Sequence, residues 1–148
     1  MSPPLAQQTR YWCQIGLLTG VYVLAGLLSF ATNVNEGLAS LVWAPTGVSI
    51  AALMVAGYRY WPGVFLGATL TNLIVSDNLM LGGIIGVGNT IEALLAVWLI
   101  RYFTPMEKLF DGIRTTVIFI VSASLIAPIP SAIAGALGML SFNIIDVA

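Results

Sequence analysis

The chain has 148 residues, of which 59% are hydrophobic and 7% are charged, and its formal net charge is −1. A globule of this length cannot bury so much apolar surface inside itself, so the composition predicts an all-α integral membrane protein. The few bases are scattered singly, which disfavours nucleic acid as a partner. Histidine is absent and Cys13 is the lone cysteine, so we expect no metal, no cofactor and no catalytic residue.

Five apolar segments predict a multi-span helical bundle with about five transmembrane helices. They run from Tyr11 to Ala31, Trp43 to Tyr58, Pro62 to Ser76, Leu81 to Phe103 and Ile113 to Leu140. The second and third are short for a straight crossing, and whether they fully span the bilayer stays open. The fifth contains Pro128 and Pro130, which should kink or break its helix.

Charge placement predicts the orientation. The bases all fall on one side of the predicted spans: Arg10, Arg59, Arg101, Lys108 and Arg114. The opposite ends carry Glu36, Asp77 and Asp146. The positive-inside rule therefore makes residues 1–10 a cytoplasmic N-terminus and residues 11–148 a transmembrane domain. Because five spans would leave the last residue outside, we expect this domain to be the first part of a larger protein.

Small residues indicate how the helices pack. In the fourth segment they fall on one face, at Gly82, Gly86, Asn89, Ala93 and Ala96, which lets membrane helices approach closely. Similarly spaced small residues occur in the first, third and fifth segments, at Gly16 and Gly20, at Gly63, Gly67 and Thr71, and at Ala127, Ser131, Gly135 and Gly138. The simplest interpretation is that all of them serve packing.

Glu92 lies near the middle of the fourth segment. An ionised carboxylate at this depth costs on the order of 3 kcal/mol by insertion scales, so Glu92 should not face lipid. Asn89 shares its side of the helix, and Asn72 could present an amide from the neighbouring third segment. Two interpretations stay open: these residues form a ligand-binding pocket or switch, or a protonated Glu92 makes a structural hydrogen bond between helices.

The start of the second segment departs from regular helix geometry. Pro45 disfavours a helical conformation at Ala44, and Gly47 relaxes the backbone again. Residues 43–47 should therefore form a bend or a discontinuous helix entry at the outer surface, where Trp43 and Pro45 are candidate ligand-binding residues. At the inner interface we expect an aromatic and basic anchor formed by Tyr58, Arg59, Tyr60 and Trp61.

Three motifs resemble the amino-terminal part of the MASE1 domain, an integral membrane sensory module of bacterial signalling proteins. They are Trp43-x-Pro45-x-Gly47, Tyr60-Trp61-Pro62-Gly63 with Gly67 and Asn72, and Gly88-Asn89-Thr90-x-Glu92-Ala93. Their order and spacing carry the resemblance, which extends from the first segment through the fifth. The chain departs from the family at Ala44, where a second proline is frequent, so the bend should be less rigid.

The resemblance implies a module of about eight helices in the bacterial inner (plasma) membrane. It also implies a cytoplasmic output domain, either a histidine kinase of a two-component system or an enzyme of cyclic-di-GMP signalling. The stimulus would be a ligand, a partner membrane protein or protonation, and the full-length protein would form a homodimer. Neither a kinase nor a cyclase motif is present in these residues, so the chain itself is not expected to be an enzyme.

Other function classes stay open beside the sensor. A fragment or subunit of a small-solute transporter is the second choice, because short, proline-interrupted segments near a carboxylate also occur at transporter binding sites. A passive membrane anchor, in which Glu92 only joins helices, is the third. An intramembrane protease is disfavoured, because no histidine is present to activate a serine and no aspartate pair falls within the spans.

Overall fold

The computed structural model describes residues 5–32 and 43–142, which form helices and no strands. The α-helices in these ranges are α1 (Leu5–Ala31), α2 (Ala44–Ala56), α3 (Trp61–Ser76), α4 (Leu79–Phe103), α5 (Ile113–Ile120) and α6 (Pro128–Ser141). The all-helical prediction is thereby confirmed. Two of the acids used to predict the orientation, Glu36 and Asp146, lie outside the described residues.

Helix lengths separate possible spans from shorter elements. Helices α1 and α4 and the stretch Ile113–Ser141 are each long and apolar enough to cross a membrane. Helix α2 has 13 residues and α3 has 16. At 1.5 Å per residue these two are about 20 and about 24 Å long, which is less than a hydrocarbon core of about 30 Å. The five complete crossings therefore stay a prediction.

Helices α1 and α3 run parallel and pack closely. The Thr19 hydroxyl donates to the Gly63 carbonyl at 3.2 Å, and Gly67 lies against the Tyr22 side chain. Because the residue numbers of both contacts increase together, the two helices run in the same direction. A Cβ atom at Gly67 would collide with the Tyr22 ring. The missing side chain therefore lets α3 approach a large, fully buried aromatic residue on α1.

A tight turn connects α3 to the antiparallel α4. Asp77 has a left-handed backbone with φ of 51°, and the Asn78 side chain caps α4 by accepting from the Met80 and Leu81 amides, each at 3.0 Å. The two helices then pack through the predicted small-residue face, where Gly82 and Gly86 contact α3 at Thr69.

Helix α2 runs antiparallel to α1. Near one end of the pair, the Ala44 amide donates to the Ser29 hydroxyl at 3.1 Å, and near the other the Tyr11 hydroxyl donates to the Arg59 carbonyl at 2.9 Å. A short 3₁₀ turn, Tyr58–Tyr60, follows α2 and leads directly into α3. The α2–α3 pair is thereby fixed along α1 at both ends.

The last apolar segment stays one helical stretch, Ile113–Ser141, but its α-helical pattern is interrupted ahead of the prolines. Helix α5 passes into a π-helical stretch, η3 (Val121–Ile126), and α6 begins at Pro128. Because Pro128 has no N–H, the α-helical bond to the carbonyl four residues earlier cannot form. The wider turn includes a bond from the Ala127 amide to the Ser122 carbonyl at 3.0 Å. We call α5, η3 and α6 together the α5–α6 arm.

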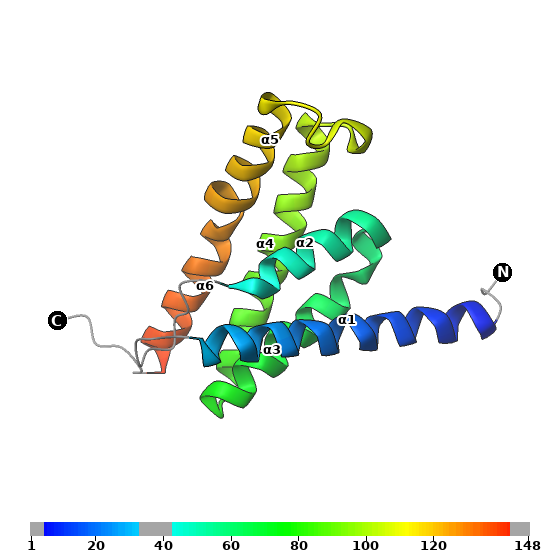
Figure 1. The fold of residues 1–148 in the computed structure, drawn as a ribbon. Coiled ribbons are helices and arrows are strands. Elements are labelled where there is room, and N and C mark those ends of the chain that lie inside the picture. Colours follow the sequence, from blue (N-terminus) through cyan, green and yellow to red (C-terminus); the bar gives the residue numbers. More distant parts are fainter. Residues whose placement is uncertain (1–4, 33–42, 143–148) are drawn as a thin grey trace.

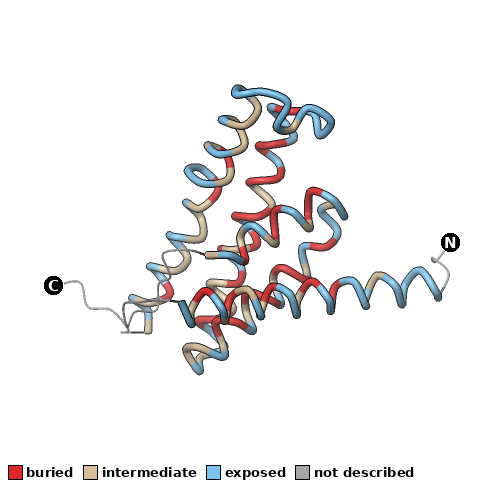
Figure 2. Tube along the Cα trace, viewed as in Figure 1, coloured by how far each residue is buried: buried red, intermediate tan, exposed pale blue. Residues whose placement is uncertain are grey.

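The core lies between α1, α2, α3 and α4, whereas the α5–α6 arm is only partly covered (Figure 2). Half of the most apolar stretch of α4 is buried, against 11% for Ile113–Ser141. In Figure 1, α4 and the arm run side by side, and the amino-terminal end of α1 extends beyond the other helices. The arm contacts the core chiefly through α6 and α4.

Three of the predicted packing glycines do not serve packing within the described part of the chain. A Cβ atom built at Gly16, Gly20 or Gly135 would meet nothing within 4 Å. Small residues spaced along one face of a helix therefore indicate a possible contact face, and whether another helix covers that face depends on the tertiary arrangement.

The structure corrects two details of α2 and its flanks, since residues 43–47 form the expected helix entry without a bend and Tyr60 is buried. Ala44 is the first residue of the helix and Gly47 lies inside it, so the irregular backbone is confined to Trp43, whose φ and ψ are −101° and 83°. Pro45 is tolerated because it occupies the first helical turn. At the other end, the Tyr60 ring does not face lipid: it is 4% exposed and its hydroxyl donates to Gln14 Oε1 at 2.6 Å.

Candidate functional site

A cavity of about 630 Å³ lies where α2, α3, α4 and the α5–α6 arm meet the end of α1. The aromatic and polar residues that line it include Phe30, Trp43, Thr46, Asn72, Asn89, Glu92 and Ser131. The structure thus brings together four of the five residues singled out in the sequence. The fifth, Pro45, is fully buried in the first turn of α2 and is not among the lining residues.

Glu92 connects three helices at this cavity. Its side chain is 5% exposed, and the Thr46 hydroxyl on α2 donates to its Oε1 at 3.0 Å. The Ser131 hydroxyl on α6 donates to the Pro128 carbonyl of its own helix at 2.9 Å and lies beside the carboxyl group in the wall of the same cavity. Because Thr46 belongs to the first turn of α2, the positive end of that helix faces the carboxyl group.

This contact corrects the position expected for the start of α2. Residues 43–47 were predicted to lie at the outer surface, whereas Thr46 bonds to a residue about halfway along α4. The first turn of α2 therefore begins beside the polar centre of α4, a feature shared with the interrupted helices that line membrane binding sites.

The two amides take different roles. Asn89 Nδ2 donates to the buried Tyr22 hydroxyl at 3.2 Å, which connects the cavity wall to α1. Asn72 also lines the cavity, but its Nδ2 donates to the Ala68 carbonyl of its own helix at 2.9 Å. Asn89 thus joins helices, while Asn72 places a polar side chain at the wall.

An aromatic pair forms another part of the wall. Phe30 of α1 and Trp43 meet edge to face, with their ring centroids 5.2 Å apart and their planes at 77°. This geometry suits the opposite charge distributions of a ring edge and a ring face. The cavity therefore combines a carboxyl group, amides and hydroxyls with an apolar ring surface, as small-molecule sites commonly do.

Sequence reasoning did not assign Thr46, Ser131 or Phe30 to a site. Ser131 was noted only as a small residue, and the other two were not considered. The two hydroxyl residues each directly follow a proline in an apolar segment, Pro45 and Pro130. That placement was the available signal, because residues near a proline break are positioned to face an irregular, polar part of the bundle.

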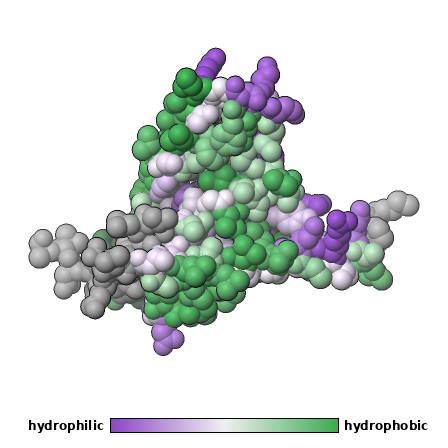
Figure 3. All heavy atoms as spheres, in the orientation of Figure 1, coloured by the Kyte–Doolittle hydropathy of each residue, from purple (hydrophilic) through white to green (hydrophobic). Residues whose placement is uncertain are grey.

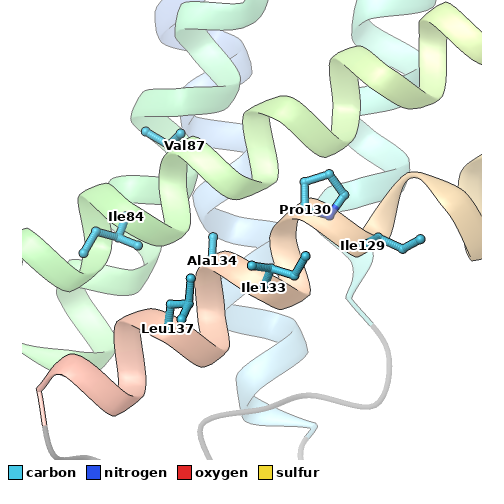
Figure 4. Close-up of a pocket in the computed structure, with 7 residues that line it drawn as sticks. All are labelled: Ile84, Val87, Ile129, Pro130, Ile133, Ala134 and Leu137. Atoms are coloured by element: carbon cyan, nitrogen blue, oxygen red, sulfur yellow. The ribbon is translucent and has the colours of Figure 1, made fainter.

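A second cavity of about 570 Å³ lies on another face of α6. Figure 4 shows its lining between α4 and α6: Ile84, Val87, Ile129, Pro130, Ile133, Ala134 and Leu137. We call it the apolar groove, and the cavity beside Glu92 the polar cavity. The lining of the apolar groove contains no hydroxyl, amide or charged side chain, so it offers no group that could select a polar ligand.

The chemistry available in the polar cavity is binding and proton exchange. Glu92 can accept or release a proton and can bind a hydrogen-bond donor or a cation, with Thr46 and Asn89 beside it. In residues 5–32 and 43–142, no group of three His, Cys, Asp or Glu side chains is placed to hold a metal ion. The polar cavity therefore offers an occupant one carboxyl group together with amide and hydroxyl groups.

Comparison with known proteins gives one match. The family model MASE1 matches residues 14–148, which cover most of the chain and include all three motifs found in the sequence. No curated protein and no solved structure matches. The resemblance read from the motifs is confirmed.

Proposed function

The chain belongs to the MASE1 family of membrane sensory domains of signalling proteins, and from this premise we propose that the polar cavity beside Glu92 is its stimulus-sensing site. The observation that carries the proposal is the contact of Glu92 with Thr46 on α2 and its proximity to Ser131 on α6. A ligand or proton that changes this contact acts on three helices at once.

The relay is a shift between two packings of α6 against α4. Ser131 lies on α6 shortly after the π-helical stretch η3, and such stretches frequently occur at functional sites. A stimulus favours one packing only if it binds the two states with different affinity, since equal binding would move nothing. Glu92 provides that difference, because its hydrogen bonds depend on where α2 and α6 lie.

The proposed topology has five crossings of the bacterial inner membrane with the N-terminus in the cytoplasm. It is supported by the helix directions, which alternate from α1 through α4, and by the position of the bases. Figure 3 shows hydrophilic residues near the amino-terminal end of α1 and at the α4–α5 connection, with a largely apolar surface between them. Arg101 also donates to the Met54 carbonyl at 2.8 Å, so this base lies near the end of α2.

In this proposal the signal leaves the membrane toward a cytoplasmic output domain, a histidine kinase or a cyclic-di-GMP enzyme, in a full-length homodimer. A ligand, a partner membrane protein or protonation remains the class of stimulus. Any catalytic activity belongs to that output domain, because the MASE1 family is sensory and non-catalytic.

The test is Glu92→Gln in the full-length protein. Glutamine keeps the oxygen that accepts from Thr46 but cannot ionise, so we expect normal insertion and an output activity changed at least about fivefold, the lower range of allosteric coupling. The matched control is Glu107→Gln, which removes an exposed carboxylate in the α4–α5 connection. Output equal to that of the parent across pH, at equal membrane level, would overturn the proposal.

A transporter is the second candidate function. The observation that favours it is the short helix α2, which begins beside a carboxyl group about halfway along α4. Reconstituted vesicles distinguish the two: a transporter accumulates solute against a gradient and Glu92→Gln stops the accumulation, whereas a sensor binds without moving anything across the membrane.

A further inference from the structure

A third cavity, of about 680 Å³, lies at the amino-terminal end of α1 beside the α2–α3 junction. Its lining includes Gln7, Gln8, Arg10, Tyr11, Arg59 and Tyr60. It is separate from the polar cavity, with which it shares no lining residue. Neither the sensory proposal nor the family match assigns it a role.

This cavity selects for negative charge. Arg10 and Arg59 both line it, and both are exposed. In the described part of the chain, no aspartate or glutamate is among its lining residues. Two permanent positive charges therefore face one space with no acid beside them, which favours an anion over a neutral or cationic occupant.

Aromatic contacts hold Arg59 in position. Its Nη2 donates to the Tyr60 hydroxyl at 3.0 Å, and its Cζ lies 4.9 Å from the Tyr60 ring centroid and 6.0 Å from that of Tyr11. Because a guanidinium carries five N–H donors, a single bond to Tyr60 leaves donors for phosphate oxygens. Arg59 is thus oriented before any anion arrives.

A further hydrophobic groove, which we call the α1–α2 groove, adjoins this cavity and is distinct from the apolar groove between α4 and α6. The two share Gln14 and Tyr60, and the groove has a volume of about 300 Å³. Its other lining residues are Leu17, Leu18, Val21, Val48, Ala52 and Ala56. Leu17 is 70% exposed, so the groove opens toward the lipid-facing side of α1. The cavity that contains Arg10 and Arg59, which we call the basic cavity, is therefore continuous with the α1–α2 groove.

We propose that the basic cavity and the α1–α2 groove together form a binding site for one anionic phospholipid. The phosphate lies between Arg10 and Arg59, and an acyl chain follows the groove past Leu17. The exposed Trp12, which also lines the cavity, suits the headgroup level of a bilayer. Basic cavities between membrane helices are known to hold such headgroups, and the continuous groove favours a lipid over free phosphate.

Binding of phosphatidylglycerol and phosphatidylcholine with identical chains is compared on the purified full-length protein by native mass spectrometry. We expect phosphatidylglycerol to bind at least tenfold more tightly, because surface charge contributes roughly fivefold for each arginine. Arg10→Gln alone should reduce this preference about fivefold, and Arg10→Gln with Arg59→Gln should abolish it. Lys108→Gln with Arg114→Gln, which removes two bases elsewhere, should leave it unchanged.

Three results would overturn the lipid site. One is equal binding of the two lipids by the parent protein, and another is an equal loss of preference in the Lys108 and Arg114 variant, which would indicate unspecific attraction by net charge. The third is glycerol phosphate binding as tightly as phosphatidylglycerol, since the groove would then contribute nothing. None of these outcomes depends on Glu92, so the sensory proposal is tested separately.

Discussion

Helix α6 borders two cavities of similar volume and opposite chemistry. The apolar groove, about 570 Å³, is lined by aliphatic side chains and Pro130, whereas the polar cavity, about 630 Å³, contains Glu92, Asn89 and hydroxyl groups. Contact of Gly88 with Ser131 and Ala134 separates them, because Ser131 lines the polar cavity and Ala134 lines the apolar groove.

The comparison teaches that volume alone does not identify a site in a membrane protein. Lipid tails are as apolar as aliphatic side chains and can fill the apolar groove without specific recognition. Lipid tails do not suit the polar cavity in the same way, because buried carboxyl, amide and hydroxyl groups cost free energy unless they are hydrogen-bonded. Converging polar groups therefore distinguish the proposed sensing site from the apolar groove.

The largest expected effect comes from disrupting the close contact between Gly88 on α4 and helix α6, which separates the two cavities. In Gly88→Leu the new side chain collides with Ala134 and the α6 backbone, which forces α6 away from α4. Overpacking of this kind costs about 3 kcal/mol, so the free energy of unfolding should fall by that amount. Unfolding of the purified protein in detergent measures it.

Gly83→Leu is the matched control on the same helix. A Cβ atom at Gly83 meets nothing within 4 Å, so this variant gains the same helix propensity without a collision. Equal stability of the two variants would show that α4 and α6 do not pack through Gly88.

A smaller effect is expected from Thr46→Val, which keeps the side-chain shape and removes the donor to Glu92. Leaving a buried polar group without its partner costs about 1–3 kcal/mol. Thr9→Val, at an exposed position whose hydroxyl bonds within its own helix, should change the free energy of unfolding by less than about 0.5 kcal/mol. If the two substitutions cost the same, the Thr46–Glu92 bond contributes nothing to stability.

Sequence reasoning identified the polar residues of the site because they break the rules of a membrane span. Glu92 and Asn89 are polar residues in an otherwise apolar helix, and Trp43 lies two residues before Pro45. Thr46 and Ser131 were missed because a single hydroxyl in a span usually bonds to its own helix, as Thr71 does with the Gly67 carbonyl and Ser131 with the Pro128 carbonyl. Whether such a hydroxyl reaches another helix depends on packing, which a single sequence does not show.

The fold was predictable at the level of apolar segments, and the irregularity expected near the prolines of the last one takes the form of the η3 stretch in a continuous helix. The corrected expectations for Tyr60, Gly16 and Gly20 concern which side of a helix is covered. Tyr60 was expected to face lipid at the interface because aromatic residues gather there, but its side chain is buried against α1 and its hydroxyl donates to Gln14. Gly16 and Gly20 match a packing pattern, yet no helix in the described ranges covers them.

The central claim is that the polar cavity, unlike the apolar groove, is open to water and polar ligands. Cysteines placed at two neighbouring positions of α6 test it most directly, in a Cys13→Ser background that removes the exposed native thiol. Ser131→Cys faces the polar cavity and Ile133→Cys faces the apolar groove. Thiols react as thiolates, so only a hydrated cysteine reacts quickly with a water-soluble thiol reagent.

We predict that in opened membranes Ser131→Cys reacts at least about tenfold faster than Ile133→Cys, since thiolate formation requires water. Equal rates, or faster reaction at Ile133→Cys, would contradict the account, because the cavity beside Glu92 would then be no more accessible to a polar ligand than the lipid-facing groove.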